Sequence, residues 1–264
     1  MAYQTGNIRY RGSFKSIRHW KNKHDPKIYA GEKGGANRDL IMNNKAFART
    51  RENMTEFEGC GMAVKAIRLG MNKLLPEHAN THFTGRVVSM VKMINENDQL
   101  SERGKRGIFF SQNKPLLKTL TFHEKKKIDR ELKMSITTSH PESRSEATLT
   151  IEGLNPDQRF RPSSAQYYRV INHLSIISDF AMDADGKVYE SQSPLNKTSA
   201  YAYSDYTVVN TPLNIELKAA FPEGTLLGES DTVIQCVGIE YYLKSGADDY
   251  LPFSESSMLV FDVF

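Results

Sequence analysis

The hydrophobic pattern of this 264-residue chain changes its period near Lys114, and this change limits the fold classes open to it. Between positions 44 and 106, apolar residues recur at steps of three and four, as they do on one face of a helix. Beyond Lys114, short β-branched and aromatic runs are separated by turn sequences such as Asp185-Gly186 and Ser245-Gly246. The pattern predicts an α+β chain that ends in an antiparallel β-sandwich.

Three regions are expected along the chain. Residues 1–35 form an extended basic arm or hairpin, residues 36–113 a helical region, and residues 114–264 the β-sandwich domain. In the arm, apolar or small residues alternate with polar ones from Ile8 to Phe14, which is the period of a strand. A turn is expected near Lys23–Pro26, and the glycine-rich stretch from Gly31 to Gly35 interrupts regular structure.

An antiparallel pair of helices is expected on the two sides of Pro76. One apolar stripe belongs to the first helix, and it comprises Phe47, Met54, Phe57, Gly61, Val64, Ile67 or Arg68, Met71 and Leu74. The second helix carries Phe83, Val87, Val91 and Ile94 on one side. Gly59 and Gly61 weaken the first helix by up to about 1 kcal/mol each relative to alanine. Their presence predicts the close approach of another backbone.

Nine strand segments are expected in the C-terminal region: 116–123, 130–137, 146–152, 165–180, 187–190, 206–219, 231–243, 247–251 and 256–264. The apolar residues of 165–180 would also suit a helix. Their β-branched and aromatic content favours a strand.

Charge is divided between the two halves of the chain. Residues 1–127 carry a net charge of +14 and residues 128–264 a net charge of −10, which together give the +4 of the whole chain. Such a division concerns partners and association rather than fold. The positive half can attract polyanions, or it can attract the negative half of a neighbouring copy.

No recognisable catalytic constellation competes with these two alternatives. His78 and His82 have the i,i+4 spacing of helical metal ligands, but no glutamate lies between them, and solvated capping histidines are expected. Asp183–Gly186 with Glu190 resembles part of a calcium loop and is better explained by a hairpin turn. Gly31–Gly35 lacks the spacing of a phosphate loop. We therefore expect a non-enzymatic protein without a cofactor or metal.

Only two cysteines, Cys60 and Cys236, are present, so neither a disulfide framework nor a cysteine metal site is expected. The start of the chain lacks the apolar stretch of a secretory signal, and no run reaches the roughly 18–20 apolar residues of a membrane span. Synthesis in the cytoplasm is expected, and an extracellular location would follow the release of an assembled filament.

One segment carries a family resemblance. The stretch Glu32-Lys-Gly-Gly35, followed by Phe47-Ala-Arg-Thr-Arg-Glu-Asn53 and Glu56-Phe57, resembles a family of uncharacterised proteins common in Bacteroidota genomes. The resemblance implies a glycine-bearing N-terminal hairpin, a helix opened by this segment, and a β-rich C-terminal part. It supplies no catalytic residue.

The leading hypothesis is a structural subunit that assembles head to tail into a filament or tube. The basic N-terminal half would dock on the acidic C-terminal half of a neighbouring copy, with possible exchange of a strand. The apolar C-terminal strand needs burial in its own sandwich or in another copy. The expected interface residues are Arg9, Tyr10, Arg11, Phe14, Ile17, Arg18, Trp20, Arg49, Arg51, Glu52, Glu56 and Phe264.

The alternative partner is a nucleic acid. Basic residues in 1–30 interleave with aromatic ones, and residues 103–127 contain two further basic clusters, Arg103–Arg106 and Lys125–Lys127. Basic side chains beside aromatic rings can hold phosphates and stack bases.

Overall fold

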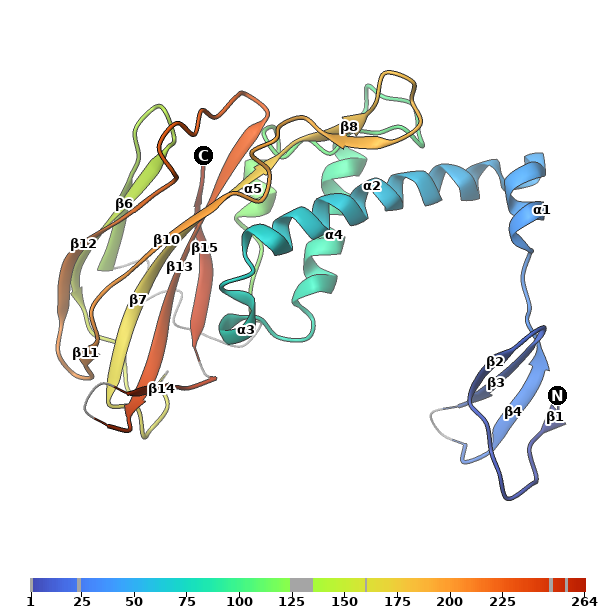
Figure 1. Cartoon of the computed structure of the whole chain (residues 1–264), viewed down its shortest axis with the longest axis horizontal. Coiled ribbons are helices and arrows are strands. Elements are labelled where there is room, and N and C mark those ends of the chain that lie inside the picture. Colours follow the sequence, from blue (N-terminus) through green and yellow to red (C-terminus); the bar gives the residue numbers. More distant parts are fainter. Residues whose placement is uncertain (1, 23–24, 124–134, 160, 247–248, 255) are drawn as a thin grey trace. The chain divides into compact units, whose positions relative to one another are not determined.

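The computed structural model describes residues 2–22, 25–123, 135–159, 161–246, 249–254 and 256–264, and its ribbon is drawn in Figure 1. It confirms the α+β class, with a large antiparallel sheet in the C-terminal part. The chain divides into two compact units, Met1–Arg51 and Glu52–Phe264. This division differs from the three expected regions, because the helices after residue 52 belong to the same unit as the sandwich.

The first unit is built on a small antiparallel sheet of four strands. Its order is β1 (Ala2–Tyr3), β4 (Ile28–Glu32), β3 (Ile17–Lys21) and β2 (Gly12–Phe14). The hairpin of β3 and β4 turns where the sequence predicted, although Lys23 and His24 lie outside the described residues. A short helix α1 (Arg38–Asn43) and a 3-10 turn η1 (Lys45–Phe47) follow, and Asn37 and Asn44 cap them.

Four helices contribute to the second unit: α2 (Ala48–Gly70), α3 (Leu75–His78), α4 (Phe83–Asn97) and α5 (Lys114–Leu117). The two long helices match the expected pair, with Pro76 at the start of α3. The strand expected over 116–123 is wrong. Pro115 favours the first turn of a helix, and in the rest of that segment only Thr121 forms a bridge, to Leu259.

The strands of the second unit form two packed sheets and a hairpin. The smaller sheet has the order β12 (Leu213–Ala220), β6 (Glu146–Leu154), β5 (Ile136–Ser139). The larger sheet has the order β10 (Ser199–Tyr203), β7 (Tyr167–Ser178), β13 (Asp231–Lys244), β14 (Tyr250–Pro252). In addition, β11 (Thr207–Val208) pairs with β7 and β15 (Ser257–Val263) pairs with β13. The hairpin consists of β8 (Phe180–Met182) and β9 (Tyr189–Ser191).

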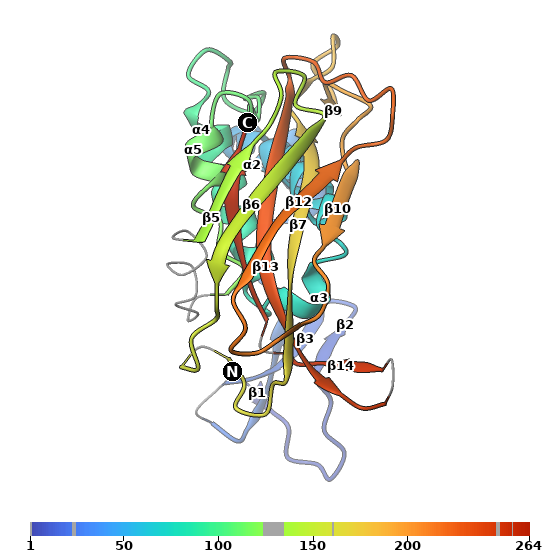
Figure 2. The same ribbon diagram turned by 90° about the vertical axis from the view of Figure 1, so that its left-hand side faces the viewer.

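The larger sheet is the middle of three layers. Figures 1 and 2 show the smaller sheet over one of its faces and the helices over the other. Along β7 and β13, alternate residues point to opposite faces, so Val170 and Val237 enter the core between the sheets while Ile171 and Ile234 pack with the helices. Burial on both faces explains why 165–180 has no clear alternation. The choice of strand for this segment is confirmed by β7.

The helices and the larger sheet share one hydrophobic core, which includes Ile67 and Val91 together with Ile171 and Ile234. This shared core is why no domain boundary falls near residue 114. Strand β10 was not expected from the sequence, whereas the segments around β6, β9, β12, β13, β14 and β15 were.

The buried face of α2 differs from the expected stripe. Met54 and Phe57 are 50% and 60% exposed, whereas Glu56, Gly59, Cys60, Ala63, Val64, Ala66, Ile67 and Gly70 are buried. The small residues are thus on the packed side. A Cβ atom added to Gly59 would lie 2.5 Å from the Tyr189 ring, so the close neighbour is an aromatic ring rather than a backbone.

Both cysteines are buried and free. Burial raises the pKa of the Cys60 thiol to about 11 and also raises that of Cys236. Among the helices of the described ranges, none combines the length and the apolar character needed to cross a membrane.

Candidate functional site

The N-terminal sheet exposes apolar side chains on a first face. Cross-strand partners lie on the same side of an antiparallel sheet, so Phe14 and its partner Ile17 share this face. Phe14 is 70% exposed and Ile17 is 43% exposed. Within residues 2–22 and 25–51, the only buried hydrophobic side chain is that of Ile28, at 7% exposure. This sheet therefore has almost no core of its own.

The second face of the same sheet is aromatic and basic. Trp20 and Tyr29 are cross-strand partners whose rings stack with centroids 6.0 Å apart, and Tyr3 pairs with Tyr29 from the other side. Arg18 lies two residues before Trp20 on β3 and therefore on the same face. The Lys27 ammonium lies 5.0 Å from the centre of the Tyr3 ring. Both faces of the sheet thus offer side chains that a partner surface could cover.

The predicted interface residues Arg9, Tyr10 and Arg11 lie in the segment between β1 and β2 and are exposed. This segment is fixed by Gln4, whose side chain accepts a hydrogen bond from Tyr10 N at 2.8 Å and donates one to Tyr10 O at 3.1 Å. The Gln4 amide also lies 2.6 Å from His19 Nδ1 on β3. The structure therefore brings Arg9, Tyr10 and Arg11 close to the sheet that holds Phe14, Ile17, Arg18 and Trp20.

The predicted residues at the start of α2 have other roles. Arg51 donates hydrogen bonds to the carbonyl oxygens of Ile41 and Asn44, at 2.6 and 2.9 Å. The Glu52 carboxylate pairs with Arg103 at 3.6 Å, and Arg49 is exposed. Arg51 and Glu52, which the sequence assigned to a subunit interface, therefore make contacts within their own chain.

Glu56 is only 1% exposed, so it does not contribute to a surface. Its carboxylate accepts hydrogen bonds from Lys92 Nζ at 2.6 Å and from Gly104 N at 2.8 Å, and Arg106 Nε lies 3.9 Å away. Burial would raise the pKa of Glu56, but these partners outweigh burial and lower it. Glu56 therefore joins α2, α4 and the loop that follows α4.

Phe264 is also buried within its own chain, at 7% exposure. Its ring stacks on His140 with centroids 3.8 Å apart, and its backbone exchanges hydrogen bonds with Val233. The preceding strand β15 pairs with β13. The apolar C-terminal strand is therefore buried in its own sandwich, which resolves the alternative that the sequence left open.

The two units carry net charges of opposite sign, as the two halves of the sequence do, but the difference between the units is smaller. Residues 1–51 carry 12 basic and 3 acidic side chains, a net charge of +9, and residues 52–264 carry 23 and 28, a net charge of −5. The basic residues Arg103 and Arg106 pair with Glu52 and Glu56, while Lys125–Lys127 lie outside the described residues.

A buried ionic centre in the larger sheet was missed by the sequence reasoning. Glu240 Oε2 accepts hydrogen bonds from Arg169 Nε, at 2.8 Å, and from the Tyr242 hydroxyl, and His78 Nε2 lies 3.3 Å from Oε1. Burial would raise the pKa of Glu240, but the bonds from His78 and Tyr242 and the charge of Arg169 outweigh it and lower the pKa to about 2. His78 is thus a buried partner of Glu240 and not a solvated cap.

Tyrosine rings surround this centre. The Arg169 guanidinium lies 3.8 Å from the Tyr203 ring centre, 5.0 Å from that of Tyr242 and 5.3 Å from that of Tyr206. Tyr206 also stacks on Tyr250 at 3.8 Å. The carboxylate is thus bonded to three side chains, which links β7, β13 and α3. The Glu240-Tyr-Tyr242 spacing on one strand was the only sequence signal for it.

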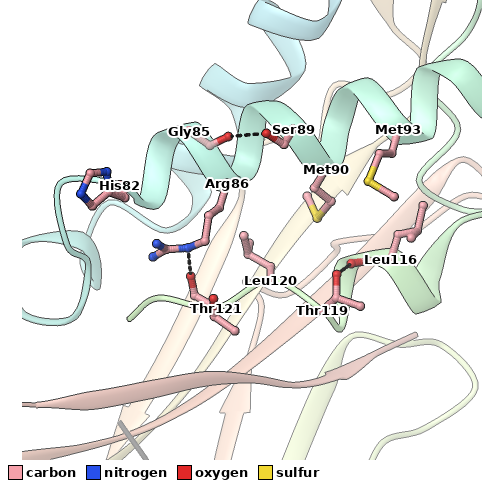
Figure 3. Close-up of a pocket in the computed structure, with 10 residues that line it drawn as sticks. All are labelled: His82, Gly85, Arg86, Ser89, Met90, Met93, Leu116, Thr119, Leu120 and Thr121. Atoms are coloured by element: carbon pink, nitrogen blue, oxygen red, sulfur yellow. Dashed lines mark hydrogen bonds between the residues drawn. The ribbon is translucent and has the colours of Figure 1, made fainter. Parts of the chain in front are cut away.

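A surface groove of about 500 Å³ lies between α4 and the segment after α5, and Figure 3 shows its lining. Met90, Met93 and Leu120 supply apolar walls. Arg86 lies at one end, where its Nε donates to Thr121 O at 2.8 Å and its Nη2 donates to Phe122 O at 2.7 Å. The Arg86 guanidinium, which is the polar group that could bind a ligand, is therefore already hydrogen-bonded to two backbone carbonyl oxygens of the same chain.

His82 lines this groove while His78 is buried at Glu240, so the two histidines do not form a shared site. Within the described ranges, no cluster of three or more His, Cys, Asp or Glu side chains could hold a metal ion. Asp183–Gly186 is a turn between β8 and β9, in which Asp183 Oδ1 accepts from Lys187 N at 2.6 Å and from Val188 N at 3.2 Å. The hairpin interpretation is confirmed.

The chain was also compared with models of protein families, with curated proteins and with solved structures, and none of the three comparisons finds a match. The geometry and charge of the N-terminal sheet are therefore the evidence for it as a candidate site.

Proposed function

We propose that this protein is a non-enzymatic structural subunit that assembles head to tail, with the N-terminal unit of one copy docked on the second unit of the next. The observation that carries the proposal is the N-terminal sheet, which exposes Phe14 and Ile17 on one face and carries the half-buried rings of Trp20 and Tyr29 on the other. Among its described hydrophobic side chains, only that of Ile28 is buried. A sheet that buries so little apolar surface gains little stability from it, and covering one face with another surface would add to that stability.

Charge supports the choice of a second copy as the partner. The N-terminal unit carries +9 and the second unit −5, so contacts between unlike units of different copies are attractive. A contact between different surfaces on identical molecules does not close on itself unless the rotation allows a ring, and it otherwise forms an open filament. Tubes and filaments are therefore the expected products.

The smaller sheet of the second unit is the proposed receiving surface. Its outward side carries the polar residues Thr148 and Thr150 on β6 and the acidic Glu216 on β12. The one lysine on this side of β12, Lys218, forms an ion pair with Glu146 at 2.7 Å. Its outer strand β5 pairs only with β6 among the described strands. An added strand could bond to the edge of β5, as in strand addition to a sheet.

The experiment compares the whole chain with a variant that lacks residues 2–36, which make up the N-terminal sheet. Negative-stain microscopy and sedimentation at several concentrations, in low and moderate salt, should show polymers of the whole chain and none of the variant. Polymers should shorten as salt screens the attraction between the two units. A whole chain that stays monomeric at every concentration would contradict assembly, and polymers that persist without the sheet would contradict its role.

A charge variant separates the sheet from the general charge of the protein. Arg9→Glu combined with Arg11→Glu should reduce polymer mass strongly. Lys187→Glu combined with Lys244→Glu changes the net charge by the same amount at exposed positions of the second unit, and it should leave polymers intact.

Nucleic-acid binding is the second candidate, because Arg18 lies on the same face as Trp20 and Tyr29 and basic groups beside aromatic rings suit single strands. Retention of single-stranded DNA by the whole chain, lost without residues 2–36 and falling steeply with salt, would favour it.

A further inference from the structure

The outward face of α2 is an unpartnered surface within the second unit. Its buried side holds Glu56, Cys60 and Ile67, and residues half a turn away from them point to solvent. The solvent side from position 54 to 69 consists of Met54, Phe57, Glu58, Gly61, Met62, Lys65, Arg68 and Leu69, all of them exposed. Met54 is 50% exposed, Phe57 60%, Met62 39% and Leu69 40%.

The order of residues on this face is self-complementary. We infer that α2 of one copy packs antiparallel against α2 of a second copy, about a twofold axis that passes between Gly61 and Met62. With 3.6 residues per turn, such an axis places Met54 opposite Leu69 and Glu58 opposite Lys65, each twice. A twofold contact requires this property, because the same patch must fit itself.

Gly61 lies at the centre of this contact. A Cβ atom built on Gly61 has no other atom within 4 Å, so the position is open on its outer side. The absence of a side chain there lets the second helix approach closely and gives space to its Met62. The same twofold axis places Phe57 beside Arg68 of the second copy, where a guanidinium can lie over the ring.

A groove beside the helix adds charge complementarity. It has a volume of about 350 Å³, and its lining includes Met62, Lys65, Asn196 and Lys197. Lys65 and Lys197 are both exposed. In the antiparallel arrangement, Glu58 of the second copy is directed to this groove, where two ammonium groups can receive one carboxylate.

This contact is independent of the head-to-tail contact. It uses residues 54–69 and the groove, none of which belongs to the N-terminal sheet, and it joins like surfaces rather than unlike ones. Combined with head-to-tail assembly, it would pair two strands of subunits running in opposite directions.

The test is disulfide cross-linking of the full-length chain carrying Gly61→Cys, read on a denaturing gel that dissolves every non-covalent polymer. Mild oxidation should produce a covalent dimer and no larger species. Its rate should exceed by at least tenfold that of Met93→Cys, which places a thiol on α4 at a residue that is 53% exposed. The native thiols of Cys60 and Cys236 are buried and do not interfere.

Charge reversal tests the proposed register. In the Gly61→Cys chain, Glu58→Lys should slow dimer formation about tenfold, and the further change Lys65→Glu should restore it. Cross-linking no faster than the Met93→Cys control, or no recovery in the double reversal, would overturn the proposal.

A second measurement needs no substitution. A carbodiimide reagent applied to the unaltered chain should join Glu58 to Lys65 or Lys197 of a second copy, as identified by mass spectrometry of mixed isotope-labelled and unlabelled protein. A link from Glu58 to a lysine of the N-terminal sheet would assign this face to that sheet and overturn the twofold contact. Loss of polymers with intact cross-linking would instead count only against the proposed head-to-tail function.

Discussion

Arg169 on β7 and Glu240 on β13 are cross-strand partners, and Arg169 Nε lies 2.8 Å from Glu240 Oε2. The same carboxylate is bonded to Tyr242 and His78, and its side chain is only 7% exposed. Three groups from β7, β13 and α3 therefore depend on one buried negative charge.

Glu240→Gln should lower the free energy of unfolding by about 3 kcal/mol, since removing one member of a buried ion pair leaves the other charge uncompensated. Urea unfolding followed by circular dichroism measures this loss. Glu223→Gln, at an exposed loop position, is the matched control and should change stability by no more than about 0.5 kcal/mol. A loss below about 1 kcal/mol for Glu240→Gln would contradict a structural role for the pair.

Acid should destabilise the protein in two steps. Burial lowers the pKa of His173 to about 4 from its usual 6.5, so the unfolded chain takes up a proton first as the pH falls. Stability present above pH 6.5 is thus lost between pH 6.5 and about 4. The pKa of Glu240 is lowered from 4.5 to about 2, so a further loss of stability is expected as the pH falls from 4.5 to about 2.

Unfolding free energies measured from pH 7 to pH 3 would follow both steps. His173→Leu should flatten the curve above pH 4.5 while leaving the lower step in place. A wild-type curve that is flat between pH 6.5 and 4.5 would contradict burial of a neutral His173.

Gly59→Ala should destabilise the protein by about 1–3 kcal/mol, as overpacking of a filled core does. The new Cβ would lie 2.5 Å from the ring of Tyr189, which is 2% exposed and donates a hydrogen bond from its hydroxyl to Arg106 O at 2.8 Å. Gly61→Ala on the same helix meets no atom within 4 Å and should stabilise by up to about 1 kcal/mol. Thermal melting of dilute protein compares the two, and equal shifts of the same sign would refute the packing argument.

Glu56→Gln should loosen the loop that follows α4. The amide would keep an acceptor for Gly104 N but lose the charge that pairs with Lys92 and Arg106. Hydrogen exchange should accelerate in residues 98–107 by more than tenfold and change little in β7. Uniform acceleration across both segments would indicate global destabilisation and contradict a local role.

The sequence by itself determined the α+β class, the N-terminal hairpin and most strands of the sandwich, because hydrophobic period and turn residues act over a few positions. It also revealed the division of charge. The period of α2 was recognised, but its buried side was assigned to Met54 and Phe57, since a count of apolar residues cannot show that Gly59 and Ala63 pack on a tyrosine ring and a sheet.

Only the tertiary structure decided the surroundings of Glu56, Glu240 and Phe264. Their partners Lys92, Arg169 and His140 lie 36, 71 and 124 positions away in the sequence. Contacts over such separations depend on how sheets and helices stack, which local patterns do not encode. The stacking in the second unit leaves the outer face of α2 exposed, and the small sheet of the first unit leaves Phe14 and Ile17 exposed. Those surfaces are where we place the contacts between copies.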